Sequence, residues 1–398
     1  MNRKIQIIVC VIATFLLSLF LIVKYTHSKK DVVYTLYIGG YGNNAAQCRF
    51  NATTLDYTII RHFGAVNPSY LTLSPTGSHL YGVSENGERS GVFGYSNLPP
   101  YSSLGMEKDW GAQGCHLIYH RNTIITANYG RGGIYLYPTD ENGKILPASQ
   151  KIDFYQPVAD TLDVEITADT VGLAPAAPLS RIHMLKVVQG RESGREYLLA
   201  TDTNDDKIRV FNIVDAENGR GITIQPCNTA YYELPDDYGP RNMELSADGR
   251  FLYVLCEKSG RIVVYTLSES NSNLLLTPLQ NTLSDHYNSH ASADIHIEPS
   301  GKYLYASHRK KHDGISIYSV DKEGVIIRKA FQVTGRYPRS FAISPNGELM
   351  FVACQKDEVI QIFRINETNG LLTNTGKSIP LNGLEPSCVI ILPNSLPQ

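Results

Sequence analysis

The sequence lacks the marks of nucleic-acid binding and of metal binding. Its 398 residues include 36 Lys+Arg and 38 Asp+Glu, for a net charge of −2, and no block of basic residues follows residue 30. A chain without a basic face has little attraction for a phosphate backbone, so we expect no nucleic-acid partner. The 7 Cys and 11 His form no CxxC pair, no zinc-type Cys/His spacing and no HExxH motif. We therefore expect no metal and no cofactor.

Charged residues and tryptophan are also scarce. Only 19% of the residues are charged and Trp110 is the one tryptophan, whereas Gly (32), Pro (20) and Tyr (25) are plentiful. This balance favours many short strands and turns over long helices. Cys256, Cys354 and Cys388 lie in apolar, strand-like stretches, and we interpret them as small buried side chains.

The first thirty residues form a separate segment. Arg3 and Lys4 precede an apolar run from residue 5 to residue 23, which is long enough to cross hydrocarbon as a helix. No Ala-x-Ala cleavage pattern follows the run. We predict that residues 1–30 are a signal peptide or an N-terminal membrane anchor and that residues 31–398 form the folded domain. The expected location is the cell envelope, outside the cytosol, with the membrane as a partner if the segment is retained.

One sequence pattern recurs along the rest of the chain. It consists of alternating apolar residues, a turn that ends in glycine, and a second apolar stretch that ends on a polar residue. The four clear copies occupy residues 70–85, 243–257, 295–309 and 341–355. The glycine supplies the positive φ that a tight hairpin turn needs, and a third strand follows each copy. The recurring pattern therefore predicts one β-hairpin and one further strand per repeat.

Weaker copies bring the number of repeats to seven. The points taken as equivalent are Gly40, Glu85, Asn128, Asp202, Glu257, Arg309 and Gln355. A longer gap before Asp202 holds an insertion near residues 160–180 and the extra loop 189–195. Seven such units predict an all-β fold, a seven-bladed β-propeller, and the absence of repeated Trp-Asp pairs argues against the WD40 class. The strand near Leu36 and the strand at 387–392 are expected to complete one blade between them; a row of separate small sandwiches is the alternative.

Polar residues at the hairpin ends form a candidate site. In an antiparallel hairpin, the start of the first strand and the end of the second lie at the same edge, so Arg241 and Glu257 should be neighbours. If the units surround a common axis, such residues converge on one mouth of the central channel. The predicted set is Glu85, Asn128, His183, Asp202, Arg241, Glu257, Arg309, Arg339 and Gln355.

Each member of this set also admits a structural interpretation. Arg241 and Glu257 could form an ion pair between blade edges, His183 could be a hydrogen-bonded core histidine, and Asp202 is a good turn former. A Ca²⁺ or Mg²⁺ site built from the oxygen-bearing members is conceivable, but three arginines at the same mouth argue against it.

The chemistry of the predicted mouth suits an anionic small molecule. Guanidinium forks bind carboxylate or phosphate, and a nearby carboxylate or imidazole can move protons. A nucleotide fits less well, because the loop Gly130–Gly133 has neither a Walker lysine nor a following helix.

Several motifs follow one another in an order that points to a known family. They are Asn67-Pro-Ser, Ala127-Asn-Tyr, Gly239-Pro-Arg241 with Glu257, Asp294-Ile-His with Arg309, and Pro338-Arg339 with Gln355. This series resembles the seven-bladed lactonase family, which includes the bacterial propeller-type 6-phosphogluconolactonase and the fungal carboxy-muconate lactonising enzyme. The likeness covers roughly residues 34 to 392. Two motifs depart from it: the family's Pro-His-x-His reads Ser180-Arg-Ile-His183, and its Asp-Leu-Gly-x-Asp reads Asp202-Thr-Asn-Asp-Asp206.

The resemblance implies a lactone hydrolase acting on a small anionic sugar lactone or related acid. By matching positions it implies functional residues at His183, Arg241, Glu257 and Arg309. Glu257, with His183 assisting, would activate water, while the two arginines hold the anionic group and stabilise charge on the carbonyl oxygen. The other mouth residues, Arg339, Gln355, Glu85, Asn128 and Asp202, are expected to bind substrate. Two alternatives stay open: an envelope-tethered binding or scaffold propeller without catalysis, and a cycloisomerase acting on muconate-like diacids.

Overall fold

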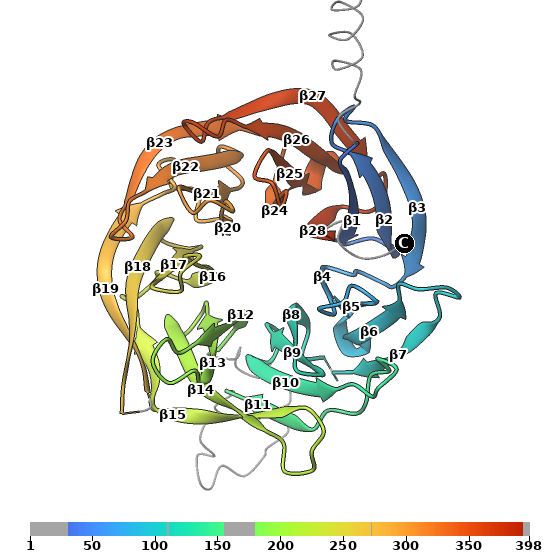
Figure 1. Ribbon diagram of the computed structural model, residues 1–398, viewed down its shortest axis with the longest axis vertical. Helices are drawn as coiled ribbons and strands as arrows, with labels where there is room; N and C mark the ends of the chain where they lie inside the picture. Colours follow the sequence, from blue (N-terminus) through green and yellow to red (C-terminus); the bar gives the residue numbers. More distant parts are fainter. Residues whose placement is uncertain (1–30, 110, 155–179, 272, 393–398) are drawn as a thin grey trace, which may run out of the picture.

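The computed structural model describes residues 31–109, 111–154, 180–271 and 273–392. Within these residues, the strands form seven four-stranded antiparallel sheets arranged around a central axis (Figure 1). The predicted all-β, seven-bladed propeller is therefore confirmed. The predicted signal or anchor segment, residues 1–30, lies outside the described residues, as does nearly all of the predicted insertion near 160–180. No helix of the described part is long and apolar enough to cross a membrane.

Each sheet is one blade, whose strands run in order from the inner strand at the axis to the outer strand at the rim. Blade I consists of β28 (Pro386–Leu392), β1 (Val33–Gly40), β2 (Asn44–Asn51) and β3 (Tyr57–Gly64); blade II of β4 (Tyr70–Leu73), β5 (His79–Ser84), β6 (Gly91–Ser96) and β7 (Ser103–Lys108). Blade III consists of β8 (Gly114–His120), β9 (Thr123–Asn128), β10 (Gly133–Pro138) and β11 (Gln150–Asp153); blade IV of β12 (Ile182–Gln189), β13 (Glu196–Asp202), β14 (Lys207–Asp215) and β15 (Ile222–Glu233). Blade V consists of β16 (Pro240–Leu245), β17 (Phe251–Cys256), β18 (Arg261–Ser270) and β19 (Asn273–Leu283); blade VI of β20 (Ser292–Ile297), β21 (Tyr303–His308), β22 (Gly314–Val320) and β23 (Ile326–Val333). Blade VII consists of β24 (Pro338–Ile343), β25 (Leu349–Cys354), β26 (Val359–Ile365) and β27 (Leu372–Pro380), and short 3-10 turns occupy Gly87–Arg89 and Gln355–Asp357.

Blade I closes the ring by joining the two ends of the propeller. Its inner strand β28 comes from the end of the chain and pairs antiparallel with β1, with Leu36 opposite Ile391 and Ile38 opposite Val389. The expected shared blade is therefore confirmed. Because the ring closes through backbone hydrogen bonds, it leaves only short, protected sheet edges.

The recurring sequence pattern folds as the predicted hairpin. In blade V, Ser246 and Gly249 form the turn between β16 and β17: Gly249 has φ 68°, and its N–H donates to the carbonyl of Ser246 at 2.9 Å. Gly77, Gly301 and Gly347 hold the same place in blades II, VI and VII, also with positive φ. A residue with a Cβ disfavours this conformation, which explains why the glycine recurs.

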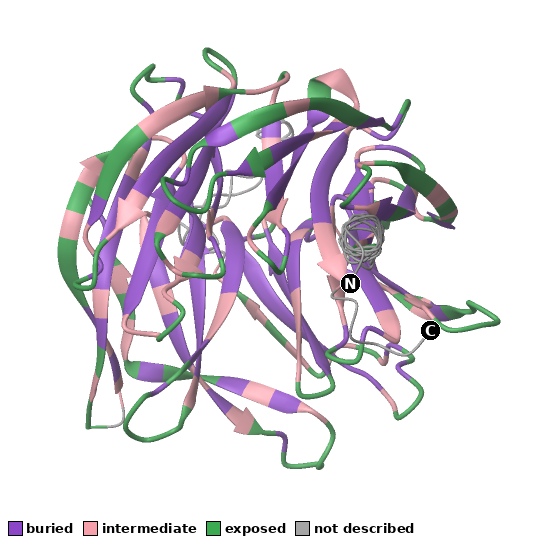
Figure 2. Cartoon of the chain, turned by 45° about the horizontal axis from the view of Figure 1, so that its top comes forward, coloured by how far each residue is buried: buried purple, intermediate pink, exposed green. Residues whose placement is uncertain are grey.

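The hydrophobic core is divided into seven layers, one between each pair of neighbouring blades. Inner and middle strands are largely buried, whereas most residues of the outer strands are partly or fully exposed (Figure 2). Cys256, Cys354 and Cys388 are at most 1% exposed and carry free thiols, as expected for small buried side chains.

Tyrosine hydroxyls link neighbouring blades at equivalent positions. Tyr81, Tyr253 and Tyr305 each lie on the second strand of a blade and donate to a glycine carbonyl in the next blade. In blade VI, the hydroxyl of Tyr305 donates to the carbonyl of Gly370 at 2.8 Å, and the tyrosine is fully buried. A buried carbonyl without a donor is costly, so these bonds fix each blade against its neighbour.

Replacing one of these hydroxyls should destabilise the propeller. We expect Tyr305→Phe to lower the free energy of unfolding by about 1–2 kcal/mol, because a buried hydrogen bond is lost. Tyr303→Phe is the matched control: its hydroxyl donates to the carbonyl of Thr368 at 2.6 Å at an exposed position on the same strand. This second change should cost less than about 0.5 kcal/mol. Urea unfolding of both variants measures the difference, and equal losses would contradict the assignment.

Candidate active site at one mouth of the channel

One backbone hydrogen bond recurs in all seven blades and defines which side chains face the axis. The N–H of Glu257, the residue after β17, donates to the carbonyl of Gly239, just before β16, at 2.7 Å. The equivalent donors in blades I to VII are Tyr41, Glu85, Tyr129, Thr203, Glu257, Arg309 and Gln355. These seven residues form the first ring at the mouth of the channel.

In three blades, the residue in this ring differs from the one that the sequence comparison of the repeats predicted. Gly40, Asn128 and Asp202 pair within the sheets, one residue before the true equivalents Tyr41, Tyr129 and Thr203. Successive side chains of a strand point to opposite faces, so a slip of one residue turns a side chain away.

Asn128 and Asp202 accordingly lie away from the mouth. Both are fully buried. The Asp202 carboxylate accepts hydrogen bonds from Ser180 and from Nε and Nη2 of Arg209 at 3.0 and 2.7 Å, together with the N–H of Arg181. Asp202 therefore stabilises the backbone where blade IV begins. Within the part of the chain that the structure describes, no three His, Cys, Asp or Glu side chains gather as metal ligands.

A second ring is formed by inner-strand residues. Each of them lies two positions along the chain after the residue whose carbonyl accepts the recurring hydrogen bond. The members of the second ring are Ser69, Cys115, His183, Arg241, Ala293, Arg339 and Ser387. Six of them, with Glu85 and the residues that follow them on the inner strands, enclose a cavity of about 20 Å³. A space of this size holds about one water molecule.

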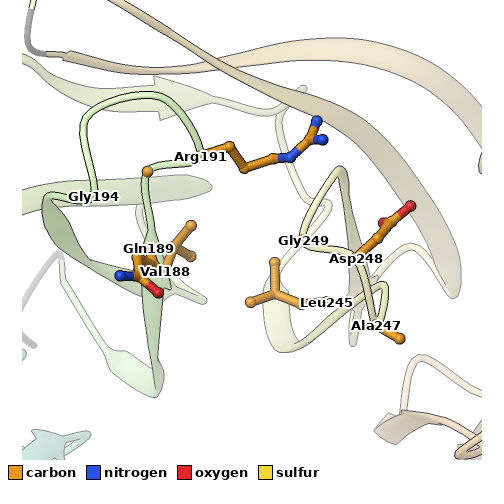
Figure 3. A pocket seen from close by; sticks show the side chains of 9 residues that line it. Val188, Gln189, Arg191, Gly194, Leu245, Ala247, Asp248 and Gly249 are labelled. Atoms are coloured by element: carbon orange, nitrogen blue, oxygen red, sulfur yellow. The ribbon is translucent and has the colours of Figure 1, made fainter.

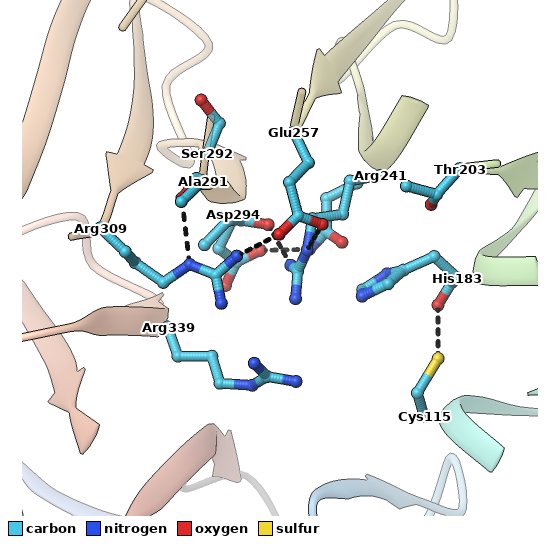
Figure 4. A network of polar contacts seen from close by, with 12 residues as sticks. Cys115, His183, Thr203, Arg241, Glu257, Ala291, Ser292, Asp294, Arg309 and Arg339 are labelled. Atoms are coloured by element: carbon cyan, nitrogen blue, oxygen red, sulfur yellow. Dashed lines mark hydrogen bonds and ion pairs between the residues drawn. The ribbon is translucent and has the colours of Figure 1, made fainter. Parts of the chain in front are cut away.

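Glu257 is held between two guanidinium groups (Figure 4). Its Oε2 accepts from Nε of Arg241 at 3.0 Å, and its Oε1 accepts from Nη2 of Arg309 at 2.6 Å. Both arginines are also fixed by backbone carbonyls: Arg241 donates to Ala293 at 2.5 Å and Arg309 to Ala291 at 3.0 Å. The two arginines are 4% and 2% exposed, whereas the Glu257 side chain is 23% exposed and faces the mouth. The predicted Arg241–Glu257 contact is thus present, and Arg309 joins it.

Arg339 points into the same space but contacts no carboxylate among the described residues (Figure 4). Its Nη2 donates to the hydroxyl of Tyr41 at 2.8 Å, and its guanidinium lies over the Tyr41 ring at 5.2 Å. The Tyr41 hydroxyl in turn donates to the Glu85 carboxylate at 3.2 and 3.3 Å. A relay from blade VII through blade I to blade II therefore lines the side of the mouth opposite blade V.

The two carboxylates of the mouth have opposite electrostatic environments. Burial raises the pKa of Glu257, but Arg241, Arg309 and Arg339 outweigh it and bring this pKa below its usual range. At Glu85 burial outweighs the hydrogen-bonding groups and the attraction of Arg339, and its pKa is raised. Burial and repulsion from Arg241 lower the pKa of Arg309 to about 10, which still leaves it charged at neutral pH. Carboxylates with pKa values pushed apart are typical of acid and base partners in catalysis.

His183 faces the cavity as a neutral ring. It is 8% exposed, stacks edge-on against Tyr129 at 6.1 Å, and has no hydrogen-bond partner at Nδ1 within the described part of the chain. Burial, followed by repulsion from Arg241 and Arg339, lowers its pKa well below 6.5. A neutral imidazole with a free nitrogen can hold a water molecule or accept a proton.

A buried ionic network supports the floor of the cavity. Asp294 accepts from Asn242 at 2.7 Å and from the N–H of Phe341 at 3.1 Å, and it contacts His296, which also bonds Glu244 at 3.0 Å. Burial lowers the pKa of His296, but the two carboxylates outweigh it and raise this pKa to about 10. The network joins blades V, VI and VII and fixes the inner strands that carry Arg241 and Arg339.

The structure also places residues at the mouth that sequence reasoning missed. Three tyrosines each stack on an arginine: Tyr41 on Arg339, Tyr337 on Arg309 at 5.0 Å, and Tyr129 on Arg181 at 4.7 Å. Tyr41 and Tyr129 each directly follow a residue taken as an equivalent point, so an alignment shifted by one position would have found them. Gln355, by contrast, was predicted; its Nε2 donates to Glu385 at 3.1 Å, and it does not line the cavity.

Larger grooves lie elsewhere on the molecule. One of about 440 Å³ lies between the loop after β12 and the turn after β16, at the opposite end of the strands that carry His183 and Arg241 (Figure 3). Its lining includes Arg191, Leu245 and Asp248 but none of the predicted site residues. The converging arginines therefore mark the mouth, and not this groove, as the candidate active site.

Comparisons with known proteins agree with this geometry. The family model described as "Lactonase, 7-bladed beta-propeller" matches residues 35–391. A 6-phosphogluconolactonase of Formosa agariphila is 29% identical over 80% of this chain and 87% of its own length. A crystal structure of a candidate 6-phosphogluconolactonase from Bacteroides fragilis is 30% identical, has a TM-score of 0.79, and is matched over 92% of this chain and 99% of that one. The periplasmic gluconolactonase PpgL of Pseudomonas aeruginosa shares the fold, with a TM-score of 0.75 at 23% identity over 92% of this chain and 100% of that one.

Proposed function

Since the chain belongs to the family of seven-bladed β-propeller lactonases, we propose that it is a hydrolase that opens the ring of an anionic sugar lactone at the mouth of its channel. The observation that carries this proposal is the cluster of three guanidinium groups around Glu257. Relatives named 6-phosphogluconolactonase suggest 6-phosphogluconolactone, or its unphosphorylated counterpart, as the substrate.

Arg339 is the proposed anchor for the anionic group. Arg241 and Arg309 are each paired with Glu257, whereas Arg339 meets only the hydroxyl of Tyr41 among the described residues. Its guanidinium therefore keeps donors for a phosphate or carboxylate, which it can bind through two parallel hydrogen bonds. Gln355 remains a proposed rim contact, while Asn128 and Asp202 support the blade ends on which the mouth is built.

The attack on the lactone carbonyl uses the opposite side of the mouth. His183 lies beside Arg241, and its Nδ1, which has no hydrogen-bond partner among the described residues, can hold the attacking water. Glu257 accepts the proton of this water as its oxygen bonds to the carbonyl carbon. The paired guanidinium groups of Arg241 and Arg309 stabilise the negative charge that develops on the carbonyl oxygen. Addition of water to a lactone needs no cofactor.

We propose that the enzyme acts in the cell envelope, held by the N-terminal segment or released by its cleavage, because the apolar run at residues 5–23 has the length and flanks of such a segment. Fractionation of cells that produce the full chain tests this location. We expect the activity in the membrane or extracytoplasmic fraction; recovery of all activity in the cytosol would contradict it.

Removing the charge of Glu257 should abolish most catalysis. We expect Glu257→Gln to reduce kcat by about 100-fold or more, because the proton acceptor is lost and two guanidinium groups are left uncompensated. Glu367→Gln, at an exposed turn, is the matched control and should change nothing. Ring opening is followed by acid release at constant pH, corrected for spontaneous hydrolysis. Full activity of a folded Glu257→Gln enzyme would refute the proposed base.

Replacing Arg339 should affect the charged substrate selectively. We expect Arg339→Gln to raise KM for 6-phosphogluconolactone at least 10-fold and to leave KM for unphosphorylated gluconolactone within about 2-fold, since a charged hydrogen bond contributes about 1.5–3 kcal/mol. Steady-state kinetics on both lactones make the comparison. An equal loss on the two substrates would show that Arg339 does not bind the phosphate.

A further inference from the structure

Glu85 is the second carboxylate of the mouth, and the proposed attack on the carbonyl leaves it without a chemical role. Blades II and V are separated by blades III and IV, so Glu85 and Glu257 approach the axis from different sides. Glu85 lines the one-water cavity together with His183, Arg241 and Arg339. A lactone whose carbonyl faces Glu257 would thus present its ring oxygen toward blades I and II.

We infer that Glu85 is the general acid of the reaction, donating a proton to the ring oxygen as the carbon–oxygen bond breaks. This assignment rests on the proposed lactone hydrolysis and adds the group that completes it. It gives the two carboxylates of one site separate tasks.

Glu85 has no cationic side chain among its direct contacts within the described ranges. The Tyr41 hydroxyl donates to its carboxylate at 3.2 and 3.3 Å, while Nη2 of Arg339 binds the same hydroxyl and not the carboxylate. Glu85 is thus the mouth carboxylate without a direct ion pair in the described part of the chain, whereas Glu257 has two. Partial burial without a direct ion pair favours the neutral form of this carboxyl.

The electrostatic surroundings agree with this division. Burial raises the pKa of Glu85, and the attraction of Arg339 and Arg241 only partly offsets it. Across the cavity the facing groups are Cys115, His116, His183 and Asp294: burial raises the pKa of the thiol and lowers the pKa of both imidazoles, so these three are uncharged at neutral pH, and Asp294 is ionised. The pKa of Glu85 is therefore shifted upward and that of Glu257 downward, the order that an acid and a base of one site require.

The proposed step balances in atoms and charge. The water oxygen bonds to the carbonyl carbon while its proton passes to Glu257, which gives a tetrahedral intermediate with the negative charge near Arg241 and Arg309. The carbonyl then re-forms, the bond from carbon to the ring oxygen breaks, and the ring oxygen takes the proton of Glu85. The product is a hydroxy acid. Glu257 releases its proton to solvent and Glu85 takes one up, which restores the enzyme.

The pH profile of kcat tests the assignment. In the wild-type enzyme we expect activity to fall on the alkaline side as Glu85 loses its proton, because a raised pKa means that the acid form persists at low pH and disappears as the pH rises through that value. Glu85→Gln should lower kcat by about 100-fold and remove the alkaline limb. Glu85→Asp should keep the limb at reduced rate, and Glu367→Gln, the surface control, should leave the profile unchanged.

Two further readouts separate a catalytic role from a structural one. Tyr41→Phe removes a hydrogen bond that lowers the pKa of Glu85, so the alkaline limb should move to higher pH. A lactone with a phenolic leaving group, dihydrocoumarin, needs less protonation, so the loss caused by Glu85→Gln should be at least 10-fold smaller on it than on gluconolactone. Thermal unfolding confirms that each variant is folded.

Failure of the general-acid role and failure of the proposed function give different results. If the wild-type chain opens no sugar lactone above the spontaneous rate, the proposed function fails and the inference falls with it. If the wild-type enzyme is active but Glu85→Gln retains the alkaline limb, or Tyr41→Phe leaves it in place, the general-acid role alone is overturned.

Discussion

The backbone hydrogen bond that closes each inner hairpin is the constraint on which the mouth depends. It fixes the residue after the second strand against the residue before the first, and seven repetitions around one axis bring the pair Tyr41–Glu85 and the pair Glu257–Arg309 to the same mouth of the channel. No local sequence could assemble these side chains, because they lie in four different blades. Closure of blade I by β28 and β1 is equally necessary, since an open ring would not hold the blades at these positions.

The geometry creates an electrostatic problem that Glu257 resolves. Three guanidinium groups converge at the mouth, and those of Arg241 and Arg309 are almost fully buried, where like charges repel strongly. Glu257 compensates two of them and is itself held ionised by all three. In the proposed mechanism, the third positive charge, on Arg339, binds the anionic group of the substrate. One arrangement of charges would then supply both the proposed binding site for a negatively charged lactone and the stabilisation of its oxyanion.

Sequence reasoning reached the fold, and the position of several candidate residues at the mouth, because the recurring sequence pattern contains both the hairpin turn and the end of the second strand. The turn glycines fixed the hairpins, and the strand ends in blades II, V, VI and VII were aligned correctly, which placed Glu85, Glu257 and Arg309 at the mouth. The alignment failed by one residue at Asn128 and Asp202, where the copies are weak: the turn before Thr123 has no glycine, and the turn that contains Gly194 is longer than in the clear copies. Because successive side chains of a strand point to opposite faces, a shift of one residue predicted the buried amide of Asn128 at the mouth in place of Tyr129. The relay from Arg339 through Tyr41 to Glu85 joins positions almost 300 residues apart in the chain, so no local sequence pattern could predict it.

The central claim is that this mouth hydrolyses an anionic sugar lactone. The most direct test is the rate of ring opening of 6-phosphogluconolactone by the purified full-length chain, measured beside gluconolactone and corrected for spontaneous hydrolysis. The structure predicts catalysis well above the spontaneous rate, with a lower KM for the phosphorylated substrate. No rate above background on either lactone would contradict the account and leave the arginine cluster as a binding site without hydrolysis.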